Sequence, residues 1–159
     1  MLLLSLPMAL TAFKLLHERP ASSYADAMAK GQYNKASEFI KLQVNENNPQ
    51  AQNALANLHY LGLGVAQNHG QAARLYHAAA SKGFAAAQLN MGHLYRQGLG
   101  VPKNVERAFA WYVHSNISGN PWAEYYMSLL SVELTLTPLQ MATTKERWQK
   151  LDQLAAEPL

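Results

Sequence analysis

The sequence of 159 residues contains no cysteine, so neither a disulfide framework nor a thiolate nucleophile is available to it. Charged residues are also few, at 14%, whereas hydrophobic residues make up 49%. That balance excludes an extended disordered chain, because so much apolar surface collapses in water. Runs of β-branched residues are missing and alanine is abundant, which favours helices. The length fits one domain, and these features together indicate a single helical domain.

Signatures of catalysis are missing as well. The sequence has no G-x-S-x-G, no H-E-x-x-H and no phosphate-binding glycine loop followed by Lys-Ser/Thr. Residues 51–119 contain one acidic residue, Glu106, so they cannot supply the carboxylate pair of a glycosidase. Glu124 and Glu133 further along offer at most a single acid, which we interpret as part of a solvated helix face. We therefore expect no enzyme activity and no cofactor.

Basic residues outnumber that single acid. Residues 51–119 have a net charge of +4, from Arg74, Lys82, Arg96, Lys103 and Arg107 against Glu106. A mild positive field favours an acidic partner, an anionic polysaccharide such as peptidoglycan, or lipid headgroups. Nucleic acid would require denser Lys and Arg with stacking aromatics, and we expect no such partner.

The longest apolar run is short. Residues 1–13 are apolar and uncharged, but about 20 residues are needed to cross a hydrocarbon core in a helix. The length suits the apolar region of a signal peptide, although no Lys or Arg precedes it. We predict that residues 1–21 are a leader and connector that export the chain or tether it to a membrane. The alternative is an uncleaved helix docked on the edge of the domain or buried in an assembly.

An internal repeat is the dominant feature that the sequence does have. Residues 51–83 align without a gap to residues 87–119, at an offset of 36 residues, and a period of this size is typical of stacked helical repeats. Eleven of the 33 aligned positions are identical. The identical pairs are Ala51/Ala87, Gln52/Gln88, Leu58/Leu94, Gly62/Gly98, Leu63/Leu99, Gly64/Gly100, Val65/Val101, Asn68/Asn104, Ala72/Ala108, Tyr76/Tyr112 and Gly83/Gly119.

Each copy predicts two helices joined by a glycine loop. Apolar residues at spacings of three and four place one face of each helix against a core. The Gly-Leu-Gly-Val segment ends the first helix, and Asn68 or Asn104 is placed to cap the second. Gly83 and Gly119 then end the second helix in a left-handed conformation.

The second copy resembles the Sel-1-like repeat, a subfamily of the tetratricopeptide-like helical repeats. The residues that follow its pattern are Ala87, Met91, Gly92, Tyr95, Gly98, Gly100, Val101, Asn104, Ala108, Trp111, Tyr112, Ser115 and Gly119. The first copy departs from it at Ala56, His59 and Leu75. The resemblance implies an all-α fold, a right-handed superhelical solenoid of stacked antiparallel helix pairs.

The period divides the rest of the chain. We predict an atypical N-terminal helix pair in residues 22–47, repeats in residues 48–83 and 84–119, and a degenerate third repeat with a C-terminal capping helix in residues 120–159. Asn48-Pro49 opens the first repeat, and Asn120-Pro121 recurs 72 residues later, which predicts that the third copy opens in the same way. The capping helix is expected over about residues 138–155, after the T-x-x-Q capping box that starts at Thr137.

The resemblance also implies a site, because the first helix of each pair in such folds lines a concave face. The variable positions on those helices are Asn53, Asn57, Tyr60, Leu89, His93, Arg96, Tyr125 and Leu129, with Val132 continuing the row. This amphipathic set suits an extended peptide or a saccharide better than a small metabolite. His59 and His93 lie on neighbouring first helices but at different repeat positions, so we interpret them as surface or packing residues rather than zinc ligands.

The predicted function is that of a non-catalytic adaptor that holds another protein. Bacterial Sel-1-like proteins are commonly scaffolds of the cell envelope, so the resemblance implies a periplasmic or membrane-tethered location, with the cytoplasm as the alternative. A second hypothesis is a binder of cell wall or polysaccharide, or a weak β-lactam-interacting enzyme, as in cysteine-rich relatives. The absence of cysteine removes the paired cysteines of those relatives.

Overall fold

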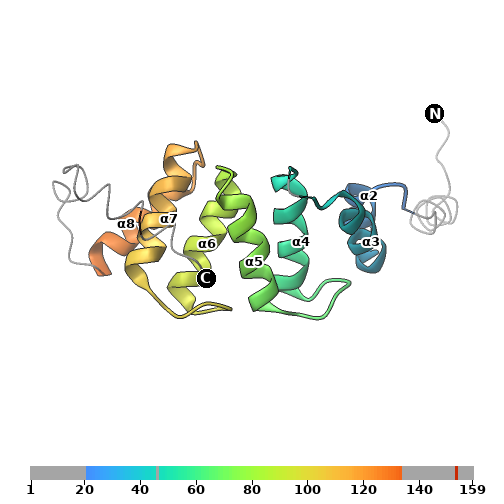
Figure 1. Ribbon diagram of the computed structural model, residues 1–159, viewed down its shortest axis with the longest axis horizontal. Helices are drawn as coiled ribbons and strands as arrows, with labels where there is room; N and C mark the ends of the chain where they lie inside the picture. The colour runs from blue at the N-terminus through green and yellow to red at the C-terminus, as the bar shows by residue number, and fades with distance from the viewer. Residues whose placement is uncertain (1–20, 46, 134–152, 154–159) are drawn as a thin grey trace, which may run out of the picture.

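The computed structural model describes residues 21–45, 47–133 and residue 153, and the helices in these segments form a single row (Figure 1). The row runs from α2 at one end of the molecule to α8 at the other, and each helix packs against the next along the chain. The helices are α2 (Tyr24–Ala29), α3 (Tyr33–Gln43), α4 (Pro49–Leu61), α5 (His69–Ala80), α6 (Ala85–Gln97), α7 (Val105–Ile117) and α8 (Ala123–Glu133). The expected all-α solenoid is confirmed, and the described segments contain no strand.

The asparagines begin the helices as the sequence predicts. Oδ1 of Asn68 accepts a hydrogen bond from the backbone N of Gln71 at 2.8 Å, and Oδ1 of Asn104 accepts one from Arg107 at 2.9 Å. Asn48 caps α4 in the same way, with Pro49 as the first helical residue. Each cap satisfies an N–H group that has no partner inside its helix.

The start of α8 differs from the prediction. Asn120 does not cap this helix as Asn48 caps α4. Its Oδ1 accepts from the backbone N of Trp122 at 3.0 Å, and the helix begins only at Ala123. A side chain that bonds two residues ahead forms a local turn, and this turn competes with the helical cap. The Asn-Pro dipeptide therefore recurs in the sequence, but its role as the start of a helix does not recur at Asn120.

The glycine loops lock each repeat onto the pair before it. Gly64 has a φ of +67°, and a Cβ there would lie 2.1 Å from the carbonyl oxygen of Tyr33 at the start of α3. Gly100 has a φ of +71°, and a Cβ there would lie 2.2 Å from the carbonyl oxygen of His69 at the start of α5. Tyr33 and His69 are themselves 36 residues apart, so the same junction occurs twice. Both the left-handed backbone and the close approach require glycine.

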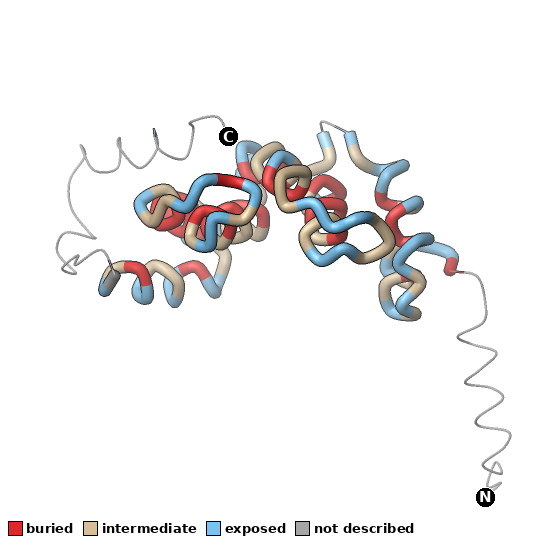
Figure 2. The backbone as a smooth tube through the Cα atoms, turned by 90° about the horizontal axis from the view of Figure 1, so that it is seen from below, coloured by how far each residue is buried: buried red, intermediate tan, exposed pale blue. Residues whose placement is uncertain are grey.

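The core is continuous through the middle of the row and thinner at its N-terminal end. The largest cluster of buried residues extends from Ala56 on α4 to Leu130 on α8 and includes the fully buried Tyr95 and Tyr112. Figure 2 shows buried backbone concentrated in these central helices. The cluster around α2 contains only Ala21, Ala27 and Ala36 as buried residues. Buried alanines at the helix contacts allow the close packing that the sequence indicates.

Two predicted segments lie outside the described residues. They are the leader and connector in residues 1–21, of which only Ala21 is described, and the capping helix over about residues 138–155, of which only Gln153 is described. Among the described helices, none has the length and apolar character to cross a membrane.

Candidate partner-binding groove

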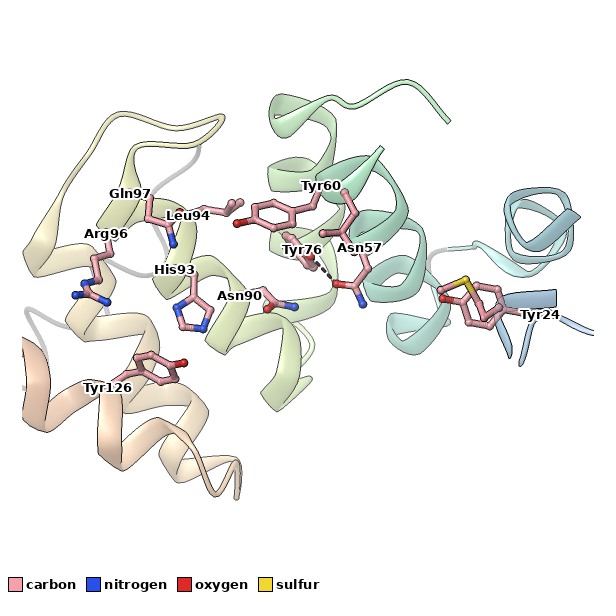
Figure 3. A pocket seen from close by; sticks show the side chains of 12 residues that line it. Tyr24, Asn57, Tyr60, Tyr76, Asn90, His93, Leu94, Arg96, Gln97 and Tyr126 are labelled. Carbon is pink, nitrogen blue, oxygen red and sulfur yellow. Dashed lines mark hydrogen bonds between the residues drawn. The ribbon is translucent and has the colours of Figure 1, made fainter. Parts of the chain in front are cut away.

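A groove of about 630 Å³ runs along one side of the row of helices (Figure 3). Most of its lining comes from the first helix of each pair, that is, from α2, α4, α6 and α8. One residue, Tyr76, reaches it from α5. The lining residues are Tyr24, Met28, Asn57, Tyr60, Leu61, Tyr76, Asn90, His93, Leu94, Arg96, Gln97 and Tyr126.

Two equivalent hydrogen bonds fix the floor of the groove. The hydroxyl of Tyr76 on α5 donates to Oδ1 of Asn57 on α4 at 2.5 Å. One repeat later, the hydroxyl of Tyr112 on α7 pairs with Nδ1 of His93 on α6 at 2.9 Å. Asn57 and His93 are 36 residues apart, as are the two tyrosines. The second helix of each repeat therefore orients a groove side chain on the first helix.

His93 sits among aromatic rings. Its ring lies edge-on to Tyr126, with the centroids 4.5 Å apart, and edge-on to Tyr112 at 5.4 Å. Burial, and next the positive charge of Arg96, hold the pKa of His93 below its usual value of 6.5. Burial also raises the pKa of Tyr112 and of Tyr76, so both hydroxyls stay protonated. The groove thus presents neutral polar groups around one permanent cation, Arg96.

A third hydrogen bond links consecutive repeats across the groove. Nδ2 of Asn90 on α6 donates to Oδ1 of Asn53 on α4 at 3.1 Å. This bond holds the two first helices in register. Among the described residues, the lining contains no Asp or Glu, and no three His, Cys, Asp or Glu side chains gather to hold a metal.

The structure brings half of the predicted site residues into this groove. Asn57, Tyr60, His93 and Arg96 line it, whereas Asn53 lies beside it through its bond to Asn90. The other three residues do not line the groove. Leu89 packs against the core, whereas Tyr125 and Leu129 are exposed on α8, at 63% and 40%.

Several lining residues were not predicted. The sequence identifies Tyr76 only as a recurring residue of a second helix, but its side chain reaches the groove, which only the three-dimensional packing shows. Asn90 and Tyr126 were also missed, although they are 36 residues apart and so occupy one repeat position. Both follow a predicted position directly, Leu89 and Tyr125 respectively. The repeat period combined with residue polarity would have identified this pair.

An apolar strip on α8 adjoins the groove. We call it the α8 strip; it consists of Trp122, Tyr125, Leu129 and Val132, which are 67%, 63%, 40% and 79% exposed. Tyr125, Leu129 and Val132 share one face of α8 and Trp122 immediately precedes the helix, whereas Ala123 and Leu130 are buried on another face. The rings of Tyr125 and Tyr126 lie 5.1 Å apart, which joins the strip to the groove. Contiguous exposed apolar surface of this kind is typical of interaction sites.

Comparisons with known proteins agree with this geometry. The family model of the Sel1 repeat matches residues 49–84 and 85–113. The crystal structure of a Sel1 repeat protein from Oxalobacter formigenes superposes with a TM-score of 0.65 at 31% identity, covering 86% of this chain and 55% of that one. A protective antigen present in uropathogenic Escherichia coli strains, which displays an SLR fold, has a TM-score of 0.64 at 22% identity, covering 84% of this chain and 29% of that one.

The chain thus spans about half of the first structure and under a third of the second. At 22% identity, the second likeness concerns the fold alone. No curated protein matches the sequence significantly.

Proposed function

This chain is a Sel1 repeat protein, and from that premise we propose that it is a non-catalytic adaptor that holds a protein partner in its groove. Sel1 repeats generally mediate protein–protein interactions. The observation that carries the proposal is the groove of about 630 Å³, whose lining comes mainly from the first helices of successive pairs. Its amide, aromatic and guanidinium groups suit a polypeptide.

The chemistry of the groove supports binding rather than bond cleavage. Its described lining offers hydrogen-bonded amides and phenols, one histidine and one arginine, and the hydroxyl that His93 contacts belongs to Tyr112, which is fully buried. The α8 strip extends the surface with apolar side chains, so Tyr125 and Leu129 join the proposed site. In such a surface the polar groove provides specific hydrogen bonds to a partner, and the apolar strip provides hydrophobic contact area.

Site-specific photo-crosslinking in cells tests where a partner binds. A photoreactive phenylalanine at Gln97, an exposed lining residue, should form a crosslink to a partner protein. The same group at Arg74, exposed on α5 and outside the groove, should form none. Crosslinks from Arg74 alone would place the partner elsewhere and contradict the proposal.

The paired substitution Tyr60→Ala and Arg96→Ala tests the contribution of the lining. Both residues occupy the same repeat position, 36 residues apart, and both face the groove. We expect capture of the crosslinked partner to fall at least tenfold, because aromatic and arginine side chains dominate binding at interfaces. Helical circular dichroism should be retained. Full capture by the double variant would show that these side chains do not hold the partner.

We also propose that the protein is located in the cell envelope. The apolar residues 1–13 and the excess of basic residues support it. Mass spectrometry of the N-terminus, on protein recovered from separated periplasmic, membrane and cytoplasmic fractions, measures both the location and any cleavage of the leader. Recovery of the full-length chain only in the cytoplasm would contradict it.

A further inference from the structure

We propose that the groove recognises one class of partner, an extended peptide segment that carries an acidic side chain, with Asn57 and Asn90 holding its main chain and Arg96 its carboxylate. This inference rests on the proposed function and specifies the ligand of the same groove. Its basis is the direction in which two amide side chains are held and the position of Arg96, the only charged group among the described lining residues.

Asn57 is held so that its amide nitrogen remains available. Its Oδ1 accepts the hydroxyl hydrogen of Tyr76 at 2.5 Å, which fixes the side chain with Nδ2 on the other side. No described acceptor bonds this Nδ2, and it is not a buried atom. Asn57 therefore offers N–H donors to the groove, which match the carbonyl oxygen of a peptide bond.

Asn90 is held in the opposite sense. Its Nδ2 donates to Oδ1 of Asn53, so its own Oδ1 is the group that remains, with no described donor bonded to it. This oxygen can accept the N–H of a peptide bond. A donor on α4 and an acceptor on α6 thus line the same groove (Figure 3). An extended main chain, which presents N–H and C=O groups along both edges, matches this pair without depending on its sequence.

Arg96 supplies the selectivity for charge. It is the only Arg, Lys, Asp or Glu in the described lining, and no described carboxylate lies within salt-bridge distance of it. The nearby groups, His93 and Tyr112, are both favoured in their neutral forms. An arginine among neutral groups in a partly desolvated groove attracts a carboxylate and repels a cation.

The probe for the test is a displayed library of random nonapeptides, panned on the full-length protein. We expect the selected peptides to share an Asp or Glu at one position. Panning on Arg96→Glu should replace that residue with Lys or Arg, whereas the charge-matched control Arg74→Glu, on the exposed face of α5, should select the same acidic peptides as the wild type. A library that yields no binder, or binders whose charge is unaffected by Arg96→Glu, overturns the proposal.

The contacts to the main chain need a separate variant. Asn57→Asp keeps an oxygen that accepts from Tyr76 but replaces the Nδ2 donor with a second oxygen, so the local bond and the fold are preserved. We expect the affinity for a selected peptide to fall about tenfold or more, because the introduced carboxylate cannot donate to the peptide carbonyl oxygen and repels it. Urea unfolding should show that stability is retained.

A peptide carrying one ester in place of an amide tests Asn90. Scanned along the selected peptide, the ester should weaken binding to the wild type several-fold at one position, and it should cost less with Asn90→Ala, which lacks the acceptor. Equal losses in both proteins, or unchanged binding by Asn57→Asp, contradict main-chain recognition. If Gln97 crosslinks to a partner in cells and no peptide binds, the adaptor function stands and this inference fails.

Discussion

At the scale of single residues, the groove shows how the second helix of a repeat prepares a position on the first. Tyr76 and Tyr112 each reach past their own helix to orient Asn57 and His93. The sequence identifies both tyrosines by their recurrence but does not indicate that they orient the groove. A side chain that is buried along its ring and polar at its tip serves both purposes, and only the packing of the two helices shows which tip reaches the groove.

The pKa of His93 predicts a pH-dependent stability. Because burial lowers this pKa below 6.5 in the folded state, the unfolded state binds more protons in the pH range below about 6.5. The contribution of neutral His93 to the free energy of unfolding should be complete above about pH 6.5. It should decrease as the pH falls below that value. His93→Asn copies Asn57, the residue at the same position in the preceding repeat, and should flatten this fall.

Urea unfolding of both proteins between pH 7.5 and 5 measures this effect. His77, whose pKa burial also lowers, is present in both and leaves a residual dependence. Identical pH profiles for the wild type and His93→Asn would contradict the assignment.

At the scale of the elements, the joints between repeats depend on loop glycines as well as on the packing of the helices. Gly100→Ala adds a Cβ that meets the backbone of His69 at 2.2 Å, in a left-handed conformation with a φ of +71°. We expect it to lower the free energy of unfolding by roughly 2–4 kcal/mol, since backbone strain and overpacking add. Gly119→Ala, with a φ of +86° but open space around it, should cost only roughly 1–2 kcal/mol.

Urea denaturation of both variants gives the comparison. Equal losses of stability would mean that the close contact with α5 contributes nothing beyond the backbone conformation. A larger loss at Gly119 would contradict the account of the joint.

The helices show which elements the sequence predicts and why some details escape it. The 36-residue period and the Asn and Gly signals predict α4 to α7, because these depend on local chemistry that recurs in both copies. Asn120 breaks the rule: it bonds to Trp122, two residues ahead, and α8 begins late. Half of the predicted site lines the groove. The rest could not be placed, because whether a surface position such as Leu89 or Asn90 faces the groove depends on the angle at which neighbouring helices pack.

At the scale of the whole molecule, stability should be graded along the row of helices. Repeat proteins gain stability from each pair and from the core that it shares with its neighbours. The buried cluster shared by α4 to α8 is much larger than the three alanines around α2. We expect the amides of α2 and α3 to exchange hydrogen faster than those of α5, α6 and α7, because local opening at the end costs less free energy.

Hydrogen exchange followed by mass spectrometry of peptic fragments tests this gradient. Uniform protection from α2 to α7 would show that the described helices unfold as one cooperative unit. Faster exchange in α6 than in α2 would reverse the expected order.

The glycine joint has a consequence for how such chains lengthen over evolution. Gly64 contacts the backbone of Tyr33, and Gly100 contacts the backbone of His69. Each repeat therefore supplies the glycine side of a contact whose other side lies in a preceding helix. A tandem duplication of any 36-residue window within residues 49–119 therefore inherits both halves in register. Adding whole repeats in this way requires no new kind of contact between repeats. Each added repeat would lengthen the groove.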